Sequence, residues 1–419
     1  MVNILEGTKR IVMTLTTKEQ IEGFLACISP VTELNAGRVI NELEGCRSDW
    51  PLLANDWDKR NVFAQVYLSL SEAYFKQQSY KRAVETLEEG IVEYSKVCEY
   101  SYSVKKDMYH NLGIYQSYLG DETAALKSFR KFVFYLTINN RTYKDIPLYC
   151  YKKISDYTIK NLKNSQITLS DPDEFDDPVD CLVFPWMEKN SADAKTDGDK
   201  VAARLINEAF SYVRIKCFVR NAPLPTAKDP RPSSNDKAEY SNVIMWPTYA
   251  DYHKGICMEY LLPTGVQSPN IEEEKTFFIQ DVDYTETVTL GDTISISEAF
   301  FTKSIEWAFE KETRLLYYDT KGTEKFKSVD VPKESLKKVF FGIRCSDDDM
   351  FKVIKALENN MTVEFYVMRL SPNDIYTFKP VKIDGAKFVA SYENEHTKNK
   401  GCLCSFVSGV VEKISNLCK

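Results

Sequence analysis

Two stretches in the first third of the chain repeat one helical pattern, and this repetition constrains the fold more than any other feature. From residue 61 the sequence reads NVFAQVYLSLSEAYFKQQSYKRAVETLEEGIVEYSK, and from residue 106 it reads KDMYHNLGIYQSYLGDETAALKSFRKFVFYL. Small or aromatic residues recur in each at helical spacing, and a polar turn (QQSY or LGDET) interrupts them. The pattern predicts two helical hairpins.

Both hairpins resemble tetratricopeptide repeats. The matching positions are Leu70, Ser71, Tyr74, Ala83, Leu87 and Gly90 in the first copy, and Leu112, Gly113, Ala125 and Phe129 in the second. Residues 32–46, TELNAGRVINELEGC, are expected to add a helix that caps the array. The resemblance implies that this region binds a protein partner, and the alternative is that it only shields the next domain.

After residue 145 the pattern changes to strand-length apolar runs separated by polar turns. The runs are IPLYCYKKI, SQITLS, YVRIKCFV, GICMEYLL, TFFIQDVDY, ETRLLYY, KKVFFGI and TVEFYVM. Helical patterns at 199–213, 296–309 and 347–360 lie between them. A chain of 419 residues is long enough for two or three domains. We therefore predict an all-α repeat region over residues 1–145 and an α+β domain with a mixed or antiparallel sheet over residues 146–419.

Composition excludes several classes of protein. The net charge is −7, and no stripe of lysine and arginine favours double-stranded nucleic acid as a passive ligand. No apolar run reaches about 18 residues and no signal peptide is recognisable, so we expect a cytoplasmic protein that does not enter a membrane. The odd count of 11 cysteines favours reduced thiols. Cys402 and Cys404 form a C-x-C pair without a second pair at zinc spacing, which favours ordinary cysteines over a metal site.

Residues 246–255, WPTYADYHKG, form the first cluster of candidate site residues. Pro247 suits the first turn of a helix and Gly255 suits a left-handed residue that closes it, so a two-turn helix is predicted. One face of this helix would carry Trp246, Tyr249, Ala250 and His253. A core role is the better interpretation for the tryptophan and the alanine. The tyrosine and the histidine are open between core packing and ligand contact, because their polar tips need partners when buried.

The second cluster combines the YCYKKI run, with Tyr151 and Lys152, and the acidic loop in ITLSDPDEFDDPVD. This loop lacks the glycine and the terminal glutamate of an EF-hand, so its Asp-Pro pairs favour turns over a calcium site. Asp177 is a candidate cap or ligand contact.

The third cluster is FTKSIEWAFEKETRLLYYDT, residues 301–320. A helix through Trp307 is expected to break near Glu310, after which Glu312 and Arg314 share one face of a strand. An E-x-E-x-R pattern also occurs on plain solvated strand edges.

Together the three clusters resemble domain of unknown function family 2971 over roughly residues 147–370, in the order LYCYKKI, ITLSDPDEFDDPVD, IKCFV, MWPTYADYHKGICMEY and KSIEWAFEKETRLL. That family looks like a remote relative of ADP-ribosyltransferases. The resemblance implies an ADP-ribosyltransferase-like fold and a pocket that takes Tyr151 or Lys152 from a first strand, Tyr249 from a second segment, and Glu312 with Glu310 from a third.

The implied chemistry is cleavage of the bond between ribose and nicotinamide in NAD. Glu312 would stabilise the developing positive charge on the ribose. Tyr249 or Trp246 would stack on nicotinamide, Lys152 or Arg314 would bind the diphosphate, and Glu310 or His253 would accept a proton.

We therefore expect an enzyme that transfers ADP-ribose from NAD to a macromolecule, or hydrolyses NAD, while the helical repeats select a partner. By resemblance only, a toxin or phage-defence role fits this architecture. The alternative is a non-catalytic adaptor that joins protein binding to nucleotide binding. A metal-dependent hydrolase is disfavoured by the three widely spaced histidines.

Overall fold

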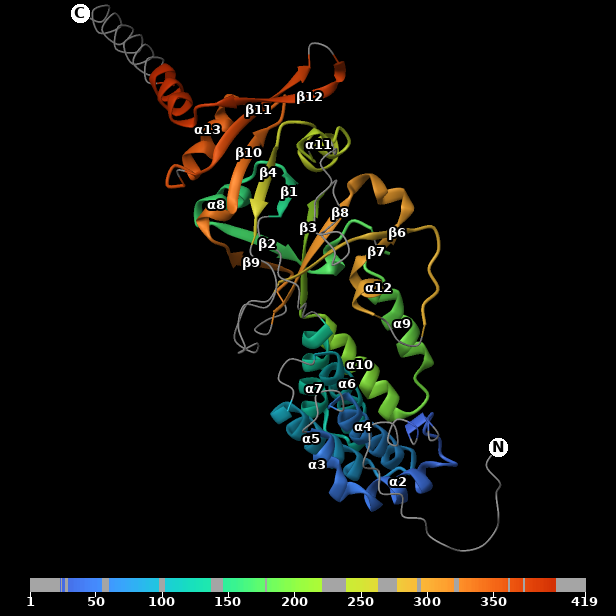
Figure 1. Cartoon of the computed structure of the whole chain (residues 1–419). Helices are drawn as coiled ribbons and strands as arrows, with labels where there is room; N and C mark the ends of the chain where they lie inside the picture. Colours follow the sequence, from blue (N-terminus) through green and yellow to red (C-terminus); the bar gives the residue numbers. More distant parts are fainter. Residues whose placement is uncertain are drawn as a thin grey trace, which may run out of the picture. The chain divides into compact units, whose positions relative to one another are not determined.

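The protein is described from a computed structural model of the whole chain (Figure 1). The structure describes residues 23, 25–26, 29–54, 60–97, 102–136, 146–177, 179–220, 239–262, 277–291, 295–319, 324–360, 362–371 and 374–396. Cys402, Cys404 and most of the proline-rich segment after residue 220 lie outside these residues. Within them, no helix combines the length and apolar character needed to cross a membrane.

The first compact unit is helical. Its helices are α2 (Ala36–Gly45), α3 (Trp50–Ala54), α4 (Arg60–Lys76), α5 (Tyr80–Val97), α6 (Tyr102–Leu119), α7 (Glu122–Leu136), α9 (Val183–Asp193) and α10 (Asp197–Phe210). The pairs α4/α5 and α6/α7 pack together, so the two predicted hairpins are confirmed, as is the additional helix within residues 32–46.

Glycines allow the helices of this unit to approach closely. A Cβ at Gly90 would lie 2.7 Å from the Tyr67 side chain, and one at Gly113 would lie 2.7 Å from the Phe129 ring. Both positions belong to the repeat-like pattern. Glycine is needed there because the neighbouring aromatic ring occupies the space of any side chain.

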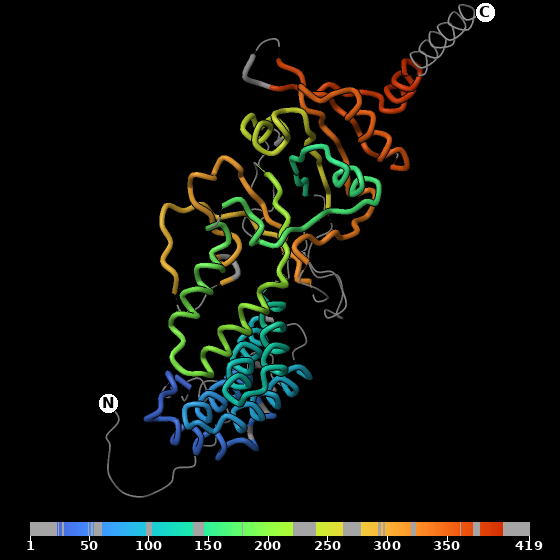
Figure 2. Tube along the Cα trace, turned by 180° about the vertical axis from the view of Figure 1, so that it is seen from behind, coloured from blue at the N-terminus to red at the C-terminus, as the bar shows by residue number. Residues whose placement is uncertain are grey.

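Two helices from the middle of the sequence, α9 and α10, belong to the helical unit. Figures 1 and 2 show α10 beside α6 and α7. The Tyr118 hydroxyl donates to Asp199 (2.5 Å) and accepts from Thr196 (2.9 Å), and Gly198 lies under its ring. The predicted boundary at residue 145 is therefore correct only in part, since Val183–Tyr212 returns to the helical unit.

The second unit is built on a ten-stranded mixed sheet, so the predicted α+β layout is confirmed. The strands are β1 (Pro147–Lys152), β2 (Gln166–Ser170), β3 (Val213–Val219), β4 (Ile256–Leu261), β5 (Phe277–Asp281), β8 (Glu312–Tyr318), β9 (Phe326–Asp330), β10 (Leu336–Phe341), β11 (Glu364–Ser371) and β12 (Asp374–Ile383). The order is β12-β11-β10-β4-β1-β3-β2-β9, and β8 pairs with β3 and β5. Only β10 and β11 run parallel among these pairs.

Because side chains point alternately to the two faces of the sheet, each face has its own hydrophobic core. Cys150, Met258 and Val339 face one side, where α8 (Asp156–Asn164) and α13 (Asp347–Ala356) pack. Tyr151 and Phe340 face the other side, where α11 (Met245–Tyr249) covers the sheet. The sheet unit also contains α12 (Ile296–Phe301) and the short strands β6 (Asp283–Thr285) and β7 (Thr302–Ser304), which pair in parallel.

Two local predictions are wrong. The helix expected through Trp307 ends at Phe301, and a strand followed by a 3₁₀ helix (Ile305–Glu310) replaces its second half. The helix over 246–255 is a single turn that ends at Tyr249, because Asp251, Tyr252 and His253 adopt left-handed conformations with φ of 46°, 52° and 70°. Gly255 is required for a different reason than predicted: a Cβ there would lie 2.3 Å from the Lys152 carbonyl oxygen.

Candidate functional site

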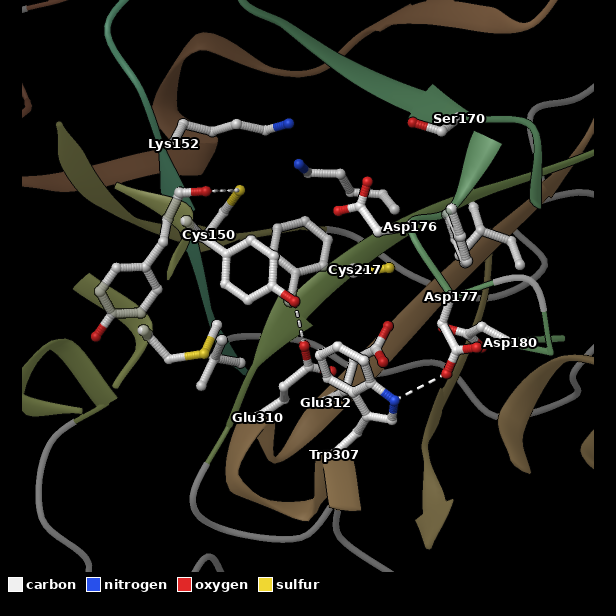
Figure 3. Close-up of a pocket in the computed structure, with 18 of the residues that line it drawn as sticks. Cys150, Lys152, Ser170, Asp176, Asp177, Asp180, Cys217, Trp307, Glu310 and Glu312 are labelled. Carbon is white, nitrogen blue, oxygen red and sulfur yellow. Dashed lines mark hydrogen bonds between the residues drawn. The ribbon is translucent and has the colours of Figure 1, made fainter. Parts of the chain in front are cut away.

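A pocket opens in the sheet unit where β3 separates from β1 and β2 (Figure 3). Within the described strands β3 is paired with β1 at Tyr149/Val219 and with β2 at Ser170/Ile215, one residue pair each, whereas its pairing with β8 extends over seven pairs. Residues of β1, β2, β3, the acidic loop, α11 and the segment from Lys303 to Glu312 line the space between these strands. Segments distant in the sequence therefore meet in one pocket.

One wall of the pocket is acidic. Glu310, Glu312 and Asp180 are each at most 5% exposed, and all three line the pocket. Lys303 contacts all of them, with Nζ at 2.7 Å from Glu310, 3.5 Å from Glu312 and 3.2 Å from Asp180. Although burial opposes the charged lysine, the three carboxylates raise the pKa of Lys303.

Arg314 supports this wall from behind. Its side chain is fully buried and forms two hydrogen bonds with each of two carboxylates: to Glu312 at 2.7 and 3.0 Å, and to Asp180 at 2.6 and 2.7 Å. The Phe300 carbonyl oxygen accepts a further bond at 2.8 Å. Arg314 is not among the residues that line the pocket, so its predicted contact with a diphosphate gains no support here. The arginine is committed to holding the carboxylates.

Glu312 is ionised at neutral pH. Burial alone would raise its pKa, but Arg314 and Lys303 stabilise the carboxylate strongly enough to lower the pKa to about 2. Its backbone N–H donates to the Tyr284 hydroxyl at 2.8 Å, which fixes the start of β8. The sequence correctly placed this glutamate at the beginning of a strand.

Tyr249 reaches the acidic wall from α11. Its hydroxyl donates a hydrogen bond to Glu310, and burial together with this carboxylate raises the pKa of the phenol. Asn242 fixes the approach of α11, since its side-chain amide donates to the Phe309 carbonyl oxygen (3.1 Å) and its oxygen accepts from the Ile244 N–H (3.1 Å). Tyr249 and Glu312 thus line the same pocket, as the three-cluster hypothesis requires.

Trp307 and Asp177 form the edge of the pocket next to the acidic wall. The indole N–H of Trp307 donates to Asp177 at 2.8 Å, and the Lys303 ammonium lies 4.7 Å from the centre of the indole ring. Asp177 also accepts from the Val179 N–H at 3.0 Å, which agrees with its predicted role in a turn. The sequence did not identify Trp307, Lys303 or Asp180 as site residues.

The opposite wall is basic. Lys152 at the end of β1 and Lys216 in β3 both line the pocket, as does Ser170. The Lys216 ammonium and burial lower the pKa of Lys152. Tyr151 and Lys152, both predicted, therefore reach the pocket. Lys216 was missed.

Two predicted contacts lie outside the pocket. Trp246 is 1% exposed, donates to the Tyr240 carbonyl oxygen at 2.9 Å, and meets Tyr151 edge to face. The ring of His253 lies parallel to that of Trp246, with 6.2 Å between the ring centres. The helix ends at Tyr249, so His253 does not continue its predicted face. The structure therefore assigns both side chains to packing on the α11 side of the sheet.

Side chains of the acidic loop cap turns, as at Asp171 and Asp177. No group of three or more His, Cys, Asp or Glu side chains suited to a metal ion occurs within the described residues. Asp171 caps a short 3₁₀ helix by accepting from the Asp173 N–H at 3.1 Å. This geometry agrees with the turn interpretation of the Asp-Pro pairs.

Comparisons with known protein families, with curated proteins and with solved structures find no match to this chain. The geometry of the pocket is therefore the basis for any functional conclusion.

Proposed function

We propose that the pocket binds NAD and that the protein transfers ADP-ribose to a macromolecule or hydrolyses NAD. One observation carries this proposal: Glu310, Glu312 and Tyr249 converge on a single pocket whose opposite wall carries two lysines. A ligand with a phosphate group at one end and a sugar that becomes cationic at the other fits this distribution of charge.

The acidic wall suits the reaction at the ribose. Cleavage of the nicotinamide bond develops positive charge on the sugar, and a fixed carboxylate stabilises that charge in a site shielded from water. Glu312 stays ionised and is held by Arg314, so it would supply this field without reorganising. Trp307 or Tyr249 would stack on the nicotinamide ring, and Glu310 would accept the proton of the attacking hydroxyl or water.

We also propose an ADP-ribosyltransferase-like fold for the sheet unit. Support comes from the separation of strands at β3, which makes room for a ligand between them, and from the E-x-E pair at the start of β8. The helical hairpins would select a protein partner in the manner of tetratricopeptide repeats. A toxin or phage-defence effector would combine these two parts.

Labelled NAD tests the proposed activity. Purified protein is incubated with NAD that carries one label on nicotinamide and another on adenine, with and without cell lysate. We expect released nicotinamide, together with adenine label on a macromolecule or in free ADP-ribose. Absence of all three products would reject the proposal.

Variants must separate catalysis from folding, because Glu312 belongs to a buried ion network. Glu312→Gln and Glu310→Gln should each lower turnover by about 100-fold or more, which is the usual scale for one electrostatic or acid–base group. Each variant must retain the wild-type circular dichroism spectrum. If both variants fold correctly and keep the turnover of the wild type, the catalytic roles assigned to the two carboxylates are contradicted.

A non-catalytic adaptor is the second candidate. It is favoured because the carboxylate oxygens of Glu312 are already occupied by hydrogen bonds within the protein. Both carboxylate oxygens of Glu312 already accept bonds from Arg314, and Lys303 adds a further contact. An adaptor would bind NAD or ADP-ribose, raise its melting temperature with ligand concentration and release no nicotinamide.

A further inference from the structure

Two lysines face each other across the opening between β1 and β3. Tyr149 of β1 pairs with Val219 of β3, and the strands are antiparallel. The same register would bring Lys152 opposite Lys216 if the strands stayed paired. The strands have separated at that point, and both lysines border the opening. Both side chains line the pocket, and Figure 3 shows Lys152 extending along its upper wall.

Neither lysine has a counterion within the described part of the chain. Lys216 is only 8% exposed, and its ammonium lies 5.7 Å from the Phe218 ring. Asp176 lines the same pocket but forms no ion pair with either lysine. By contrast, the buried Lys303 and Arg314 each contact two or more carboxylates.

Two like charges that lie close together across the opening repel each other. The Lys216 ammonium lowers the pKa of Lys152, as expected for two like charges that lie close together. An anion between them would remove the repulsion and form charge-assisted hydrogen bonds with both. Ser170 also lines the pocket, and its hydroxyl is a further donor.

We propose that Lys152, Lys216 and Ser170 form a phosphate-binding subsite that takes the diphosphate of a dinucleotide. The subsite follows from the two lysines alone, but its assignment to a dinucleotide diphosphate rests on the proposed function. In this proposal the two lysines, and not Arg314, bind the diphosphate. The donors of Arg314 already bond Glu312, Asp180 and the Phe300 carbonyl oxygen. The ligand would then extend from the lysines to the glutamates across the pocket.

Isothermal titration calorimetry tests the subsite with pyrophosphate, ADP-ribose and phosphate-free ribose at low salt. We expect the first two to bind and ribose not to bind. Lys152→Met and Lys216→Met should each weaken pyrophosphate binding at least tenfold, and Lys216→Arg should retain most of it. Lys153→Met is the matched control, because it removes the same charge one residue away, outside the pocket.

Stability provides a second readout. Lys216→Met should raise the melting temperature of the ligand-free protein, because the repulsion is lost while the aliphatic stem is kept. Unchanged pyrophosphate binding in both methionine variants would overturn the subsite, as would failure of the wild type to bind pyrophosphate or ADP-ribose. If Lys216→Met folds poorly, Lys152→Met decides, because the Lys152 side chain is more exposed than that of Lys216 and its replacement disturbs the fold less.

The two proposals fail in different ways. Pyrophosphate and ADP-ribose binding that depends on both lysines, without any nicotinamide release, would reject the enzymatic activity and keep the subsite. NAD cleavage with the same KM in the wild type and in Lys216→Met would reject the subsite and keep the activity.

Discussion

The hydroxyl of Tyr249 donates a hydrogen bond to the carboxylate of Glu310, which lies 61 residues away in the sequence. This bond joins α11 to the acidic wall and places the phenol beside the carboxylates inside the pocket. It is the contact through which the first and third sequence clusters meet.

Removal of this bond should weaken both the pocket and its activity. We expect Tyr249→Phe to lower the free energy of unfolding by about 1.5–3 kcal/mol, the usual range for a hydrogen bond to a charged group. NAD turnover should fall at least tenfold because Glu310 loses one of its two partners. Urea unfolding and nicotinamide release measure the two effects.

Tyr392→Phe is the control for that variant. Tyr392 also donates to a carboxylate, that of Asp348 at 2.6 Å, but on the exposed surface. Its loss should leave both stability and turnover close to wild type. Equal effects of the two substitutions would show that the bond inside the pocket has no special role.

The arginine behind the acidic wall should be essential for folding. Arg314→Met leaves Asp180 and Glu312 buried without their principal counterion, and breaking a buried pair in this way costs about 3–5 kcal/mol. Arg38→Met removes an exposed i,i+4 pair with Glu42 and should cost close to nothing. Urea midpoints of the two variants provide the comparison, and a small loss in Arg314→Met would refute the structural role.

Acid should selectively destabilise the protein through Glu312. The folded pKa of about 2 lies below the ordinary value of 4.5, so this carboxylate contributes stability that is fully present above about pH 4.5 and is lost as the pH falls toward 2. The shift corresponds to roughly 3 kcal/mol. The difference in unfolding free energy between wild type and Glu312→Gln should shrink by about that amount between pH 6 and pH 2, and a pH-independent difference would contradict the assignment.

A glycine fixes the segment that carries Tyr249. A Cβ at Gly342 would lie 2.1 Å from the His253 carbonyl oxygen and 3.1 Å from Trp246. Gly342→Ala should therefore destabilise the protein by about 1–3 kcal/mol through overpacking. Gly45→Ala, at a helical position with open space, should stabilise it slightly, by up to about 1 kcal/mol. If the two substitutions shift the melting temperature in the same direction, this explanation is contradicted.

Local patterns predicted most of the secondary structure. All eight strand-length runs form strands, because β-branched and aromatic residues in short apolar runs favour a pleated, buried surface. The strands β9 and β12 were missed, because lysine and aspartate interrupt the apolar run in FKSVD, and charged residues and a proline interrupt it in DIYTFKPVKI. The predicted helix at 296–309 does not form in its second half. There Lys303 lies in a short strand and contacts the carboxylates of the acidic wall.

The candidate site was only partly accessible to sequence reasoning. Glu310, Glu312 and Tyr249 were predicted as site residues through the family resemblance. The pairing of Arg314 with Asp180 depends on the packing of the acidic loop against β8, 134 residues along the chain. One available indication was overlooked. Arg214 and Lys216 alternate within the apolar run YVRIKCFV, and charges inside a buried strand require partners or ligands.

A crystal structure of the protein soaked with NAD tests the central claim most directly. We expect density for the diphosphate between Lys152 and Lys216, with the ribose next to nicotinamide against Glu310 and Glu312. An empty pocket at millimolar NAD, or a dinucleotide bound elsewhere on the protein, would contradict the account.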